Sequence, residues 1–325
     1  MIVPTVVVTG ASGFLGRVLV SRLASEGVLV RAITRTDLLD MPGVSTVRAD
    51  VRNPAQLVDA FRGVDAVFHL AAHVHDVRSA DDSSLQEAIT LGSTMAVLAA
   101  AEQVGVENII LASSLAVFGS VGFTTVREDQ ACNPNTPYGR AKLQSEAALV
   151  DFTVRTGASG ASIRPAMMYG VPCPGNLPRM IRAVSEGWFP PIPEFGNRRS
   201  MVAAFDVASA MLLAWKAKVR QGRAYNITDD QAYSTRQIYD SIRLALGRPT
   251  AGKGIPRSVF SAAARVGDLC GGLLGRRVFF DGRAYDRIAG SAHFDSARAR
   301  AELGFRPTAT LYDLMPALVR HVVSE

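Results

Sequence analysis

Few folds accommodate the glycine-rich turn that begins at residue 10. The β-branched run Thr5–Thr9 leads into Gly10-Ala11-Ser12-Gly13-Phe14-Leu15-Gly16, and an amphipathic stretch follows. In such a turn the first glycine allows a tight bend, the second lets a pyrophosphate approach the backbone, and the third lets the helix pack on the strand. A glycine triplet alone can be a simple strand-to-helix turn, but in this context it predicts a dinucleotide site. The residues expected at the cofactor are Gly10, Ser12, Gly13, Phe14, Leu15 and Gly16.

The first 165 residues alternate short β-branched runs with helical stretches. Expected strands are Thr5–Thr9, Val28–Thr34, Ala66–Leu70, Asn108–Ser113 and Ala161–Arg164, and expected helices are Arg17–Ser25, Ala55–Phe61, Ser84–Val104 and Tyr138–Thr156. Strands that alternate with helices of this length form right-handed crossovers and a parallel sheet. We therefore predict an α/β fold with a doubly wound parallel sheet of the Rossmann type.

Prolines and glycines interrupt this alternation after Tyr169, as they do in loops that bind substrate. The helix expected at Phe205–Lys216 and the strand expected at Ala224–Ile227 return to the sheet. We predict that residues 1–172 plus about 203–230 form the dinucleotide-binding domain. Residues of about 173–202 plus 231–325 would form a smaller, mainly helical substrate lobe.

Composition excludes several classes of protein. The formal net charge is +6, and the arginines are scattered rather than clustered, so nucleic acid is not an expected partner. Three widely spaced cysteines indicate free thiols in a reducing compartment, and with no leader visible before Thr5 we expect a cytoplasmic protein. Charges interrupt the apolar stretch Ile255–Leu274, so no membrane span is expected. This stretch predicts a helix packed on the body, with a membrane-surface helix as the alternative.

The end of the second strand bears on which nicotinamide is bound. An acidic residue there would bind the adenosine ribose and select NAD, but the chain has Thr34 followed by Arg35. An arginine suits a 2′-phosphate, which favours NADP over NAD. The alternative is that Arg35 is simply solvated.

Tyr138 and Lys142 lie four residues apart, on one face of the expected helix. A nearby ammonium stabilises a phenolate, so we expect Lys142 to lower the pKa of Tyr138 and make it a proton-exchanging group. Ser114 follows the expected strand end, where open α/β sheets bind ligands. In isolation, the tyrosine and lysine could be surface residues and Ser113 and Ser114 the caps of a turn.

Together these motifs resemble the extended short-chain dehydrogenases, the NAD-dependent epimerase/dehydratase family. The resemblance rests on Gly10–Gly16, Phe68-His69-Leu70-Ala71-Ala72, Ser113-Ser114, Tyr138–Lys142 and Arg164-Pro165 followed by Tyr169-Gly170. It implies a catalytic triad of Ser114, Tyr138 and Lys142, and a homodimer. It also implies cofactor contacts from Asp50 and Val51 at the adenine, from Leu70, Ala71 and Ala72 at the phosphates and ribose, and from Ser113, Tyr138, Lys142 and Pro165 near the nicotinamide.

The second half of the chain resembles nucleotide-sugar enzymes of this family. Asn176-Leu177 is similar to a diphosphate-contacting pair, and Arg199, seven residues before Asp206, matches a diphosphate-binding arginine. Arg287 lies in a late motif of the same enzymes. The resemblance implies hydride transfer at C4 of a UDP-linked sugar, by a 4-epimerase or a 4-ketoreductase of polysaccharide biosynthesis. The alternatives are a ketone reductase of the dihydroflavonol or 3β-hydroxysteroid type, and an NADP-binding redox sensor without turnover.

Three histidines, His69, His73 and His75, lie close together in the sequence. The chain is expected to turn between them, which separates their side chains. We therefore expect no metal site.

Overall fold

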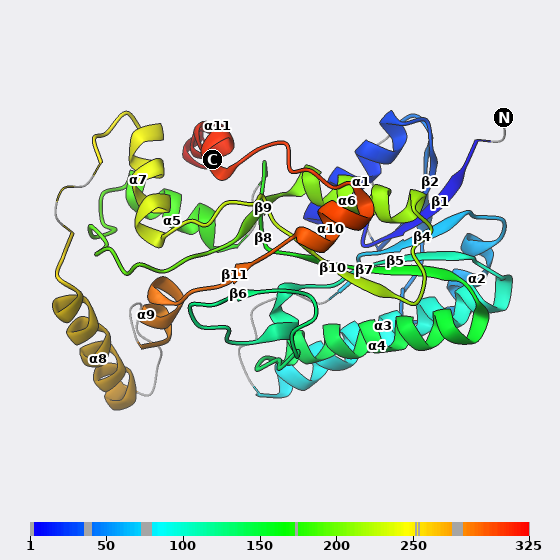
Figure 1. The fold of residues 1–325 in the computed structure, drawn as a ribbon, viewed down its shortest axis with the longest axis horizontal. Helices are drawn as coiled ribbons and strands as arrows, with labels where there is room; N and C mark the ends of the chain where they lie inside the picture. Colours follow the sequence, from blue (N-terminus) through cyan, green and yellow to red (C-terminus); the bar gives the residue numbers. More distant parts are fainter. Residues whose placement is uncertain are drawn as a thin grey trace.

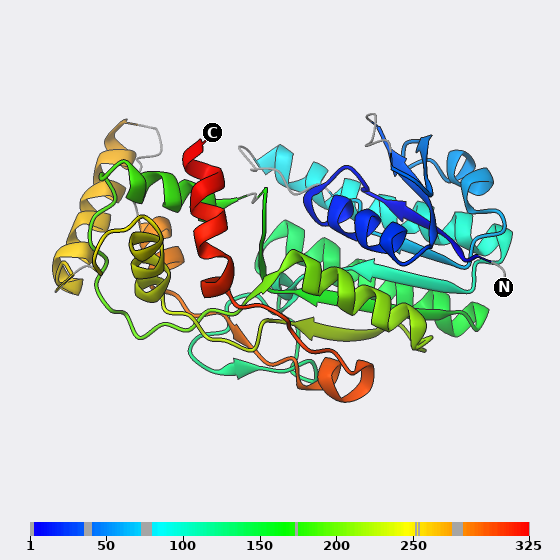
Figure 2. The same ribbon diagram turned by 90° about the horizontal axis from the view of Figure 1, so that it is seen from above.

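The computed structural model describes residues 3–35, 41–72, 80–172, 175–250, 252, 254–274 and 282–324. A twisted sheet with helices on both faces forms one side of the molecule, and a group of helices forms the other (Figure 1). The chain begins at the far end of the sheet, and its last helix lies where the two parts meet (Figure 2).

The sheet is parallel and doubly wound, as predicted. Its order across the described strands is β10-β7-β5-β4-β1-β2-β3. These strands are β1 (Thr5–Thr9), β2 (Leu29–Thr34), β3 (Val44–Arg48), β4 (Ala66–His69), β5 (Asn108–Ala112), β7 (Ser159–Pro165) and β10 (Arg223–Ile227). The chain runs outward from β1 to β3 and then returns to place β4 on the other side of β1. Ligands of such sheets bind beyond the strand ends at this reversal.

Apolar side chains of the strands pack against helices on each face. One face is covered by α2 (Pro54–Phe61), α3 (Ala80–Val104) and α4 (Pro137–Thr156), the other by α1 (Phe14–Ser25) and α6 (Ala204–Lys216). Val7 and Ile33 lie in the core under α2 and α3, while Val6 and Val8 lie in the core under α1 and α6. Both faces of the strands are therefore buried, which explains why their sequences are apolar runs rather than alternating patterns.

The second part of the molecule is mainly helical. Its helices are α5 (Asn176–Ser185), α7 (Thr235–Ala245), α8 (Arg257–Leu274), α9 (Gly282–Ala289) and α11 (Leu311–Ser324). Tyr169, Tyr233 and Phe260 contribute to its core. Asp229 follows the sheet strand β10 closely and joins the sheet to this second part. Its carboxylate accepts hydrogen bonds from the hydroxyls of Tyr169, at 2.9 Å, and Tyr233, at 2.6 Å.

Short elements connect the two parts. They are the 3-10 helix η1 (Leu115–Phe118), the strands β6 (Thr125–Val126), β8 (Met167–Tyr169), β9 (Met201–Ala203) and β11 (His293–Phe294), and the helix α10 (Ala297–Leu303). The strand β8 pairs with β9, and β11 pairs with β6.

The predicted elements are present, with bounds that differ by a few residues. The helix expected from Ser84 starts at Ala80, and the strand expected from Ala161 starts at Ser159. The edge strand β3 was not predicted, because its side chains are largely exposed and show no apolar run. The helix α8 packs on the lobe through Phe260, in line with the first of its two interpretations. No helix among the described residues is long and apolar enough to span a membrane.

One segment of the predicted lobe packs against the sheet instead. Phe294, Ala299 and Phe305 pack in the core of the sheet, beside α6 and β10, although the division at residue 231 assigns them to the lobe. Hydrogen bonds from Thr308 to the buried Asp206 of α6 hold the chain that follows. The outer limits of the two domains remain a prediction.

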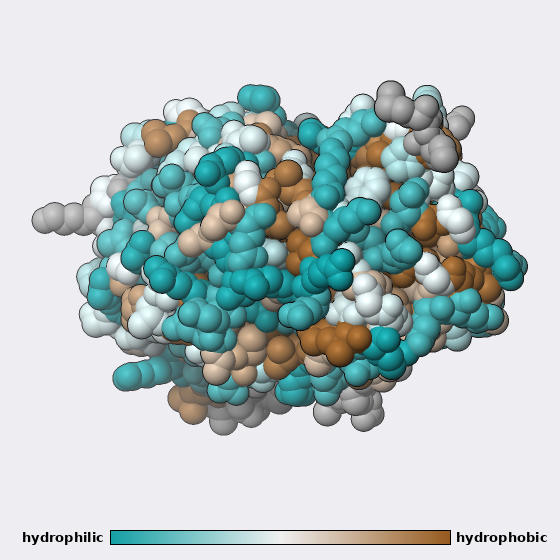
Figure 3. All heavy atoms as spheres, turned by 45° about the vertical axis from the view of Figure 1, so that its right-hand side comes forward, coloured by the Kyte–Doolittle hydropathy of each residue, from teal (hydrophilic) through white to brown (hydrophobic). Residues whose placement is uncertain are grey.

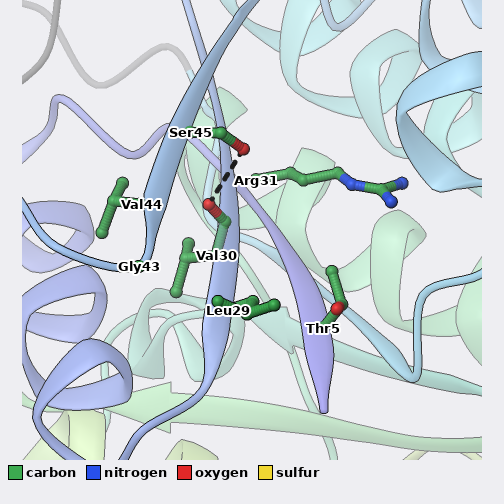
Figure 4. A pocket seen from close by; sticks show the side chains of 7 residues that line it. All are labelled: Thr5, Leu29, Val30, Arg31, Gly43, Val44 and Ser45. Carbon is green, nitrogen blue, oxygen red and sulfur yellow. Dashed lines mark hydrogen bonds between the residues drawn. The ribbon is translucent and has the colours of Figure 1, made fainter. Parts of the chain in front are cut away.

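A pocket of about 390 Å³ lies at the amino ends of β1, β2 and β3, lined by Thr5, Leu29, Val30, Arg31, Gly43, Val44 and Ser45 (Figure 4). This is the end of the sheet opposite to the glycine-rich turn, so the pocket is separate from the predicted site. The face of the molecule in Figure 3 is mostly hydrophilic, with small apolar groups between the polar side chains.

Candidate active site

The glycine-rich turn has the geometry of a phosphate site. Gly10 has a φ of +68°, and a Cβ on it would lie 2.8 Å from the amide nitrogen of Ala71. A Cβ on Gly16 would lie 2.2 Å from the carbonyl oxygen of Gly10. Gly13 caps α1 without a side-chain hydrogen bond, which leaves first-turn amides for an anion. The turn therefore fits a dinucleotide.

The other predicted residues of this turn divide into two groups. Ser12 is partly exposed and Phe14 lies beside Gly170, at the start of the irregular region. The side chain of Leu15 is buried in the core, so only its backbone faces the turn.

The end of β4 meets the end of β1 beside this turn. The amides of Leu70 and Ala71 both donate to the hydroxyl of Thr9, at 3.2 and 3.3 Å. Ala71 and Ala72 are partly buried. The structure thus brings Gly10 and Ala71 together at the reversal of strand order.

The ends of β2 and β3 carry the residues predicted near the adenosine. Arg52 forms an ion pair with Asp50 at 2.5 Å, and hydrogen bonds from Arg52 together with the positive charge of Arg35 lower the pKa of Asp50 to about 2. Val51 is partly buried against the core under α2. Arg35 is exposed, and the preceding Thr34 is buried. Arg35 and Asp50 therefore lie at the same edge of the sheet.

Ser114 and Tyr138 are brought together by two local features. Ser114 caps η1, where its hydroxyl accepts a hydrogen bond from the Ala116 amide at 3.2 Å. Helix α4 begins at Pro137, and a Cβ on Gly139 would lie 2.5 Å from the Ala116 carbonyl oxygen. Only glycine lets α4 approach η1 this closely. Tyr138 is consequently near enough to Ser114 for their side chains to interact.

Lys142 lies one turn further into α4 and is only 2% exposed. Its ammonium donates to the Ala112 carbonyl at 2.7 Å and lies 5.9 Å from the centroid of the Tyr138 ring. Burial lowers the pKa of Lys142 to about 8, and the negative charge of Glu146 opposes that shift.

The predicted direction of the Tyr138 pKa is wrong. Burial raises it, and the hydrogen bond with Ser114 only partly opposes the rise. The Lys142 ammonium donates to the Ala112 carbonyl at the end of β5 rather than to the phenol, and its charge does not outweigh the burial of Tyr138. At neutral pH Tyr138 is thus a protonated phenol, which is suited to donate to a carbonyl oxygen.

The predicted substrate residues lie on the lobe side. Asn176 is the first residue of α5 and is exposed, whereas the side chain of Leu177 is buried in the lobe core. The partly buried Arg199 guanidinium donates to the backbone carbonyl of Arg287. Burial lowers the pKa of Arg199. The structure brings Arg199 and Arg287 together.

His69 lies at the end of β4 and is completely buried. Its ring nitrogens bond to the hydroxyls of Thr9, at 2.8 Å, and Thr94, at 3.1 Å. Burial and the positive charge of Lys142 lower its pKa to about 3. Within the described ranges, His, Cys, Asp and Glu side chains form no metal-binding group. His73 and His75 lie outside the described residues.

A family model for the NAD dependent epimerase/dehydratase family matches residues 6–228. This span includes the glycine-rich turn, Ser114, Tyr138 and Lys142. The chain belongs to this family. It is an NAD-dependent enzyme of the extended short-chain dehydrogenase type.

Relatives within this epimerase/dehydratase family act on different classes of substrate. The chain is 30% identical to sterol demethylase protein B of Methylococcus capsulatus, across 94% of each chain. It is 25% identical to UDP-glucose 4-epimerase of Vibrio cholerae, across 95% of this chain and 92% of that one. The solved structure of MoeE5 in complex with UDP-glucose and NAD is 25% identical, with a TM-score of 0.78 across 98% of this chain and 99% of that one.

Sequence reasoning missed a buried ionic group behind the active site of this epimerase/dehydratase family member. The Glu146 carboxylate forms an ion pair with Arg164 and accepts a hydrogen bond from the Ser113 hydroxyl. Glu146 follows Lys142 by one helical turn, and Arg164 precedes the buried Pro165. The spacing of four residues along one face of α4 was the available signal.

Proposed function

We propose that this enzyme transfers hydride at C4 of a nucleotide sugar, with a UDP-linked hexose or N-acetylhexosamine as substrate. The reaction is either 4-epimerisation or net reduction of a 4-keto sugar. The sheet binds the nicotinamide cofactor, which supplies or accepts the hydride, and the helical lobe binds the sugar nucleotide. The protein works in the cytoplasm, where precursors for polysaccharide biosynthesis are made.

The chemistry assigned to the chain itself is proton exchange at the sugar O4. Ser114 hydrogen-bonds this oxygen, and the protonated Tyr138 donates to it as a carbonyl is reduced. In the opposite direction Tyr138 acts as the phenolate, which takes up the hydroxyl proton and becomes the phenol again. Lys142 provides a positive charge beside the phenol and a donor toward the nicotinamide ribose.

The burial and hydrogen-bond partners of the Arg199 guanidinium favour a nucleotide-sugar substrate. Its guanidinium is partly buried, and across the described parts of the chain it has a backbone carbonyl as partner but no carboxylate. Burying a cation without a counter-charge is costly. A substrate diphosphate would supply the negative charge, and a guanidinium binds its oxygens in a bidentate fashion.

The test is calorimetric binding of UDP and UDP-glucose to Arg199→Ala. Loss of a hydrogen bond to a charged group costs about 1.5–3 kcal/mol, so we expect Kd to rise about 10- to 150-fold. The matched control is Arg198→Ala, because Arg198 is the exposed neighbour, and its Kd should change little. Unchanged binding by Arg199→Ala would refute the assignment.

Epimerisation and net reduction differ in how the cofactor is used. An epimerase regenerates its cofactor in each cycle and keeps it bound, whereas a reductase exchanges it. Nicotinamide that copurifies with the protein supports the epimerase. Stoichiometric consumption of NADPH with a 4-keto sugar supports the reductase.

Arg35 supports NADP as the preferred cofactor. It is exposed at the end of β2, and its positive charge helps to lower the pKa of Asp50 at the neighbouring strand end. We expect Arg35→Ala to raise the KM for NADP at least about tenfold, since a phosphate hydrogen bond is worth about 1.5–3 kcal/mol, and to leave the KM for NAD nearly unchanged. Equal effects on both cofactors would contradict this preference.

A second candidate is reduction of a steroid-like ketone, which the similarity to sterol demethylase protein B favours. Such a substrate has no diphosphate. Turnover of an apolar ketone that Arg199→Ala leaves unchanged would support this candidate over the nucleotide sugar.

We also propose that the enzyme is a homodimer formed through α3 and α4. Met95 is 53% exposed on α3, and Val154 is 69% exposed on α4. Apolar side chains exposed on two adjacent helices suit an isologous interface. Light scattering should give a dimer for the wild type and a smaller species for Val154→Glu. A monomeric wild type would overturn this proposal.

A further inference from the structure

Glu146 is a buried carboxylate that the proposed proton exchange does not use directly. It is 5% exposed and follows Tyr138 and Lys142 at intervals of four residues along α4. Side chains at this spacing lie on one face of a helix. The same face thus carries the phenol, the ammonium and a carboxylate in sequence.

The carboxylate connects three segments that carry active-site residues. Its Oε1 accepts hydrogen bonds from the Ser113 hydroxyl and from the Arg164 Nε, the latter at 2.8 Å. Its Oε2 accepts from Arg164 Nη2 at 2.6 Å. Ser113 directly precedes Ser114 at the end of β5, and Arg164 directly precedes Pro165 at the end of β7. One side chain of α4 therefore fixes the ends of both strands.

Glu146 also contributes negative charge near Lys142. Lys142 faces the Ala112 carbonyl from β5, His69 from β4, and Tyr138 and Glu146 from α4. His69 is neutral at physiological pH because burial keeps its pKa at about 3. Among the described residues, Glu146 is the acidic side chain that favours the ammonium form of Lys142, against the effect of burial.

We propose that Glu146 is a positioning residue that aligns Ser114 and Pro165 with α4 and places a negative charge one helical turn from the Lys142 ammonium. It touches neither substrate nor cofactor and acts through Ser113, Arg164 and Lys142. Its effect on turnover rests on the proposed function. Its effect on the charge of Lys142 does not.

The charge of Lys142 is directly measurable, because the chain contains only four lysines, Lys142, Lys216, Lys218 and Lys253. NMR of protein labelled with carbon-13 at its lysine side chains gives each pKa without substrate, and Lys142→Arg assigns the signal. We expect Glu146→Gln to lower the pKa of Lys142 by about one unit, a typical effect of removing a nearby buried charge. The control Glu102→Gln removes an exposed partner of Arg155 and should leave the Lys142 signal unchanged.

Activity provides the second measurement. Because deprotonated Lys142 no longer supports the phenol, the alkaline limb of the kcat profile should move to lower pH in Glu146→Gln, by the same amount as the lysine titration. KM should change little. Glu146→Asp retains the charge but is too short for all three hydrogen bonds, so it should lower kcat without moving the limb.

The outcomes separate the two proposals. An unchanged Lys142 pKa in Glu146→Gln would overturn the positioning role, whatever the substrate. A shifted pKa with no turnover of any nucleotide sugar would retain this role for Lys142 and contradict the proposed function. Where Glu146→Gln fails to fold, Ser113→Ala removes one hydrogen bond and leaves the ion pair, and it should lower kcat. Wild-type kcat in both Ser113→Ala and Glu146→Asp would likewise overturn the proposal.

Discussion

Gly16→Ala tests whether close packing of α1 on the end of β1 makes the cofactor site. A Cβ at residue 16 would lie 2.2 Å from the Gly10 carbonyl oxygen and 2.8 Å from the backbone of Ala11. All these atoms belong to the backbone, so no side-chain rotation relieves the clash. Reaching a separation of 3.0 Å, below which real Cβ contacts are essentially never seen, requires a shift of at least 0.8 Å.

The cost of this shift falls on both stability and binding. Overpacking of a well-packed site costs about 1–3 kcal/mol of folding free energy. The same movement withdraws amides of α1 from the pyrophosphate, and each hydrogen bond to a charged group is worth about 1.5–3 kcal/mol. We therefore expect the Kd for the nicotinamide cofactor to rise at least about tenfold.

Chemical denaturation and calorimetric cofactor titration measure the two effects. The matched control is Gly92→Ala in α3, where no atom outside the helix lies within 4 Å of the added Cβ. Replacing glycine within a helix should stabilise the protein by up to about 1 kcal/mol and leave cofactor binding unchanged. Wild-type stability and affinity in Gly16→Ala would refute this account of the turn.

Two further predictions concern the catalytic helix and the buried histidine. Gly139→Ala places a Cβ 2.5 Å from the Ala116 carbonyl oxygen, which separates α4 from η1. Misplacement of a catalytic group by about 1 Å can cost about 100-fold in rate. Steady-state kinetics should therefore show kcat falling at least about tenfold, with a smaller change in KM. A wild-type kcat would contradict it. For His69, the folded pKa of about 3 lies below the unfolded value near 6.5. The unfolded chain thus takes up the proton first as pH falls, and this residue removes up to about 1.4 kcal/mol of stability per pH unit between those values. Denaturation at several pH values should show a smaller slope for His69→Gln than for the wild type, and equal slopes would exclude the effect.

Local sequence signals predicted the elements whose conformation is set by near neighbours. The glycine-rich turn, Pro137 at the start of α4 and the apolar strands identified the fold and its cofactor end. The edge strand β3 escaped prediction because an edge strand has little to bury. The segment around Phe294 was assigned to the lobe, since its packing partners on α6 and β10 are distant in sequence.

The same distinction applies to the candidate site. The triad of Ser114, Tyr138 and Lys142 was predicted from the family resemblance that their motifs carry, and the structure places the three residues near one another. The pKa of Tyr138 was predicted in the wrong direction, because burial depends on packing that no local pattern reveals. The pair of Glu146 with Arg164 was missed for a related reason: its partners come from α4 and β7.

An isotope experiment tests the proposed hydride transfer at C4 with Tyr138 exchanging the proton. UDP-hexoses and UDP-N-acetylhexosamines labelled with deuterium at C4 are incubated with wild-type enzyme and Tyr138→Phe, and the products are followed by NMR. We expect the wild type to invert C4 with the deuterium retained at that carbon, or to move the deuterium to the nicotinamide, and we expect Tyr138→Phe to be at least about 100-fold slower, as for a general acid–base group. Turnover in Tyr138→Phe at the wild-type rate, or the absence of any C4 chemistry while UDP-sugars bind, would contradict this proposal.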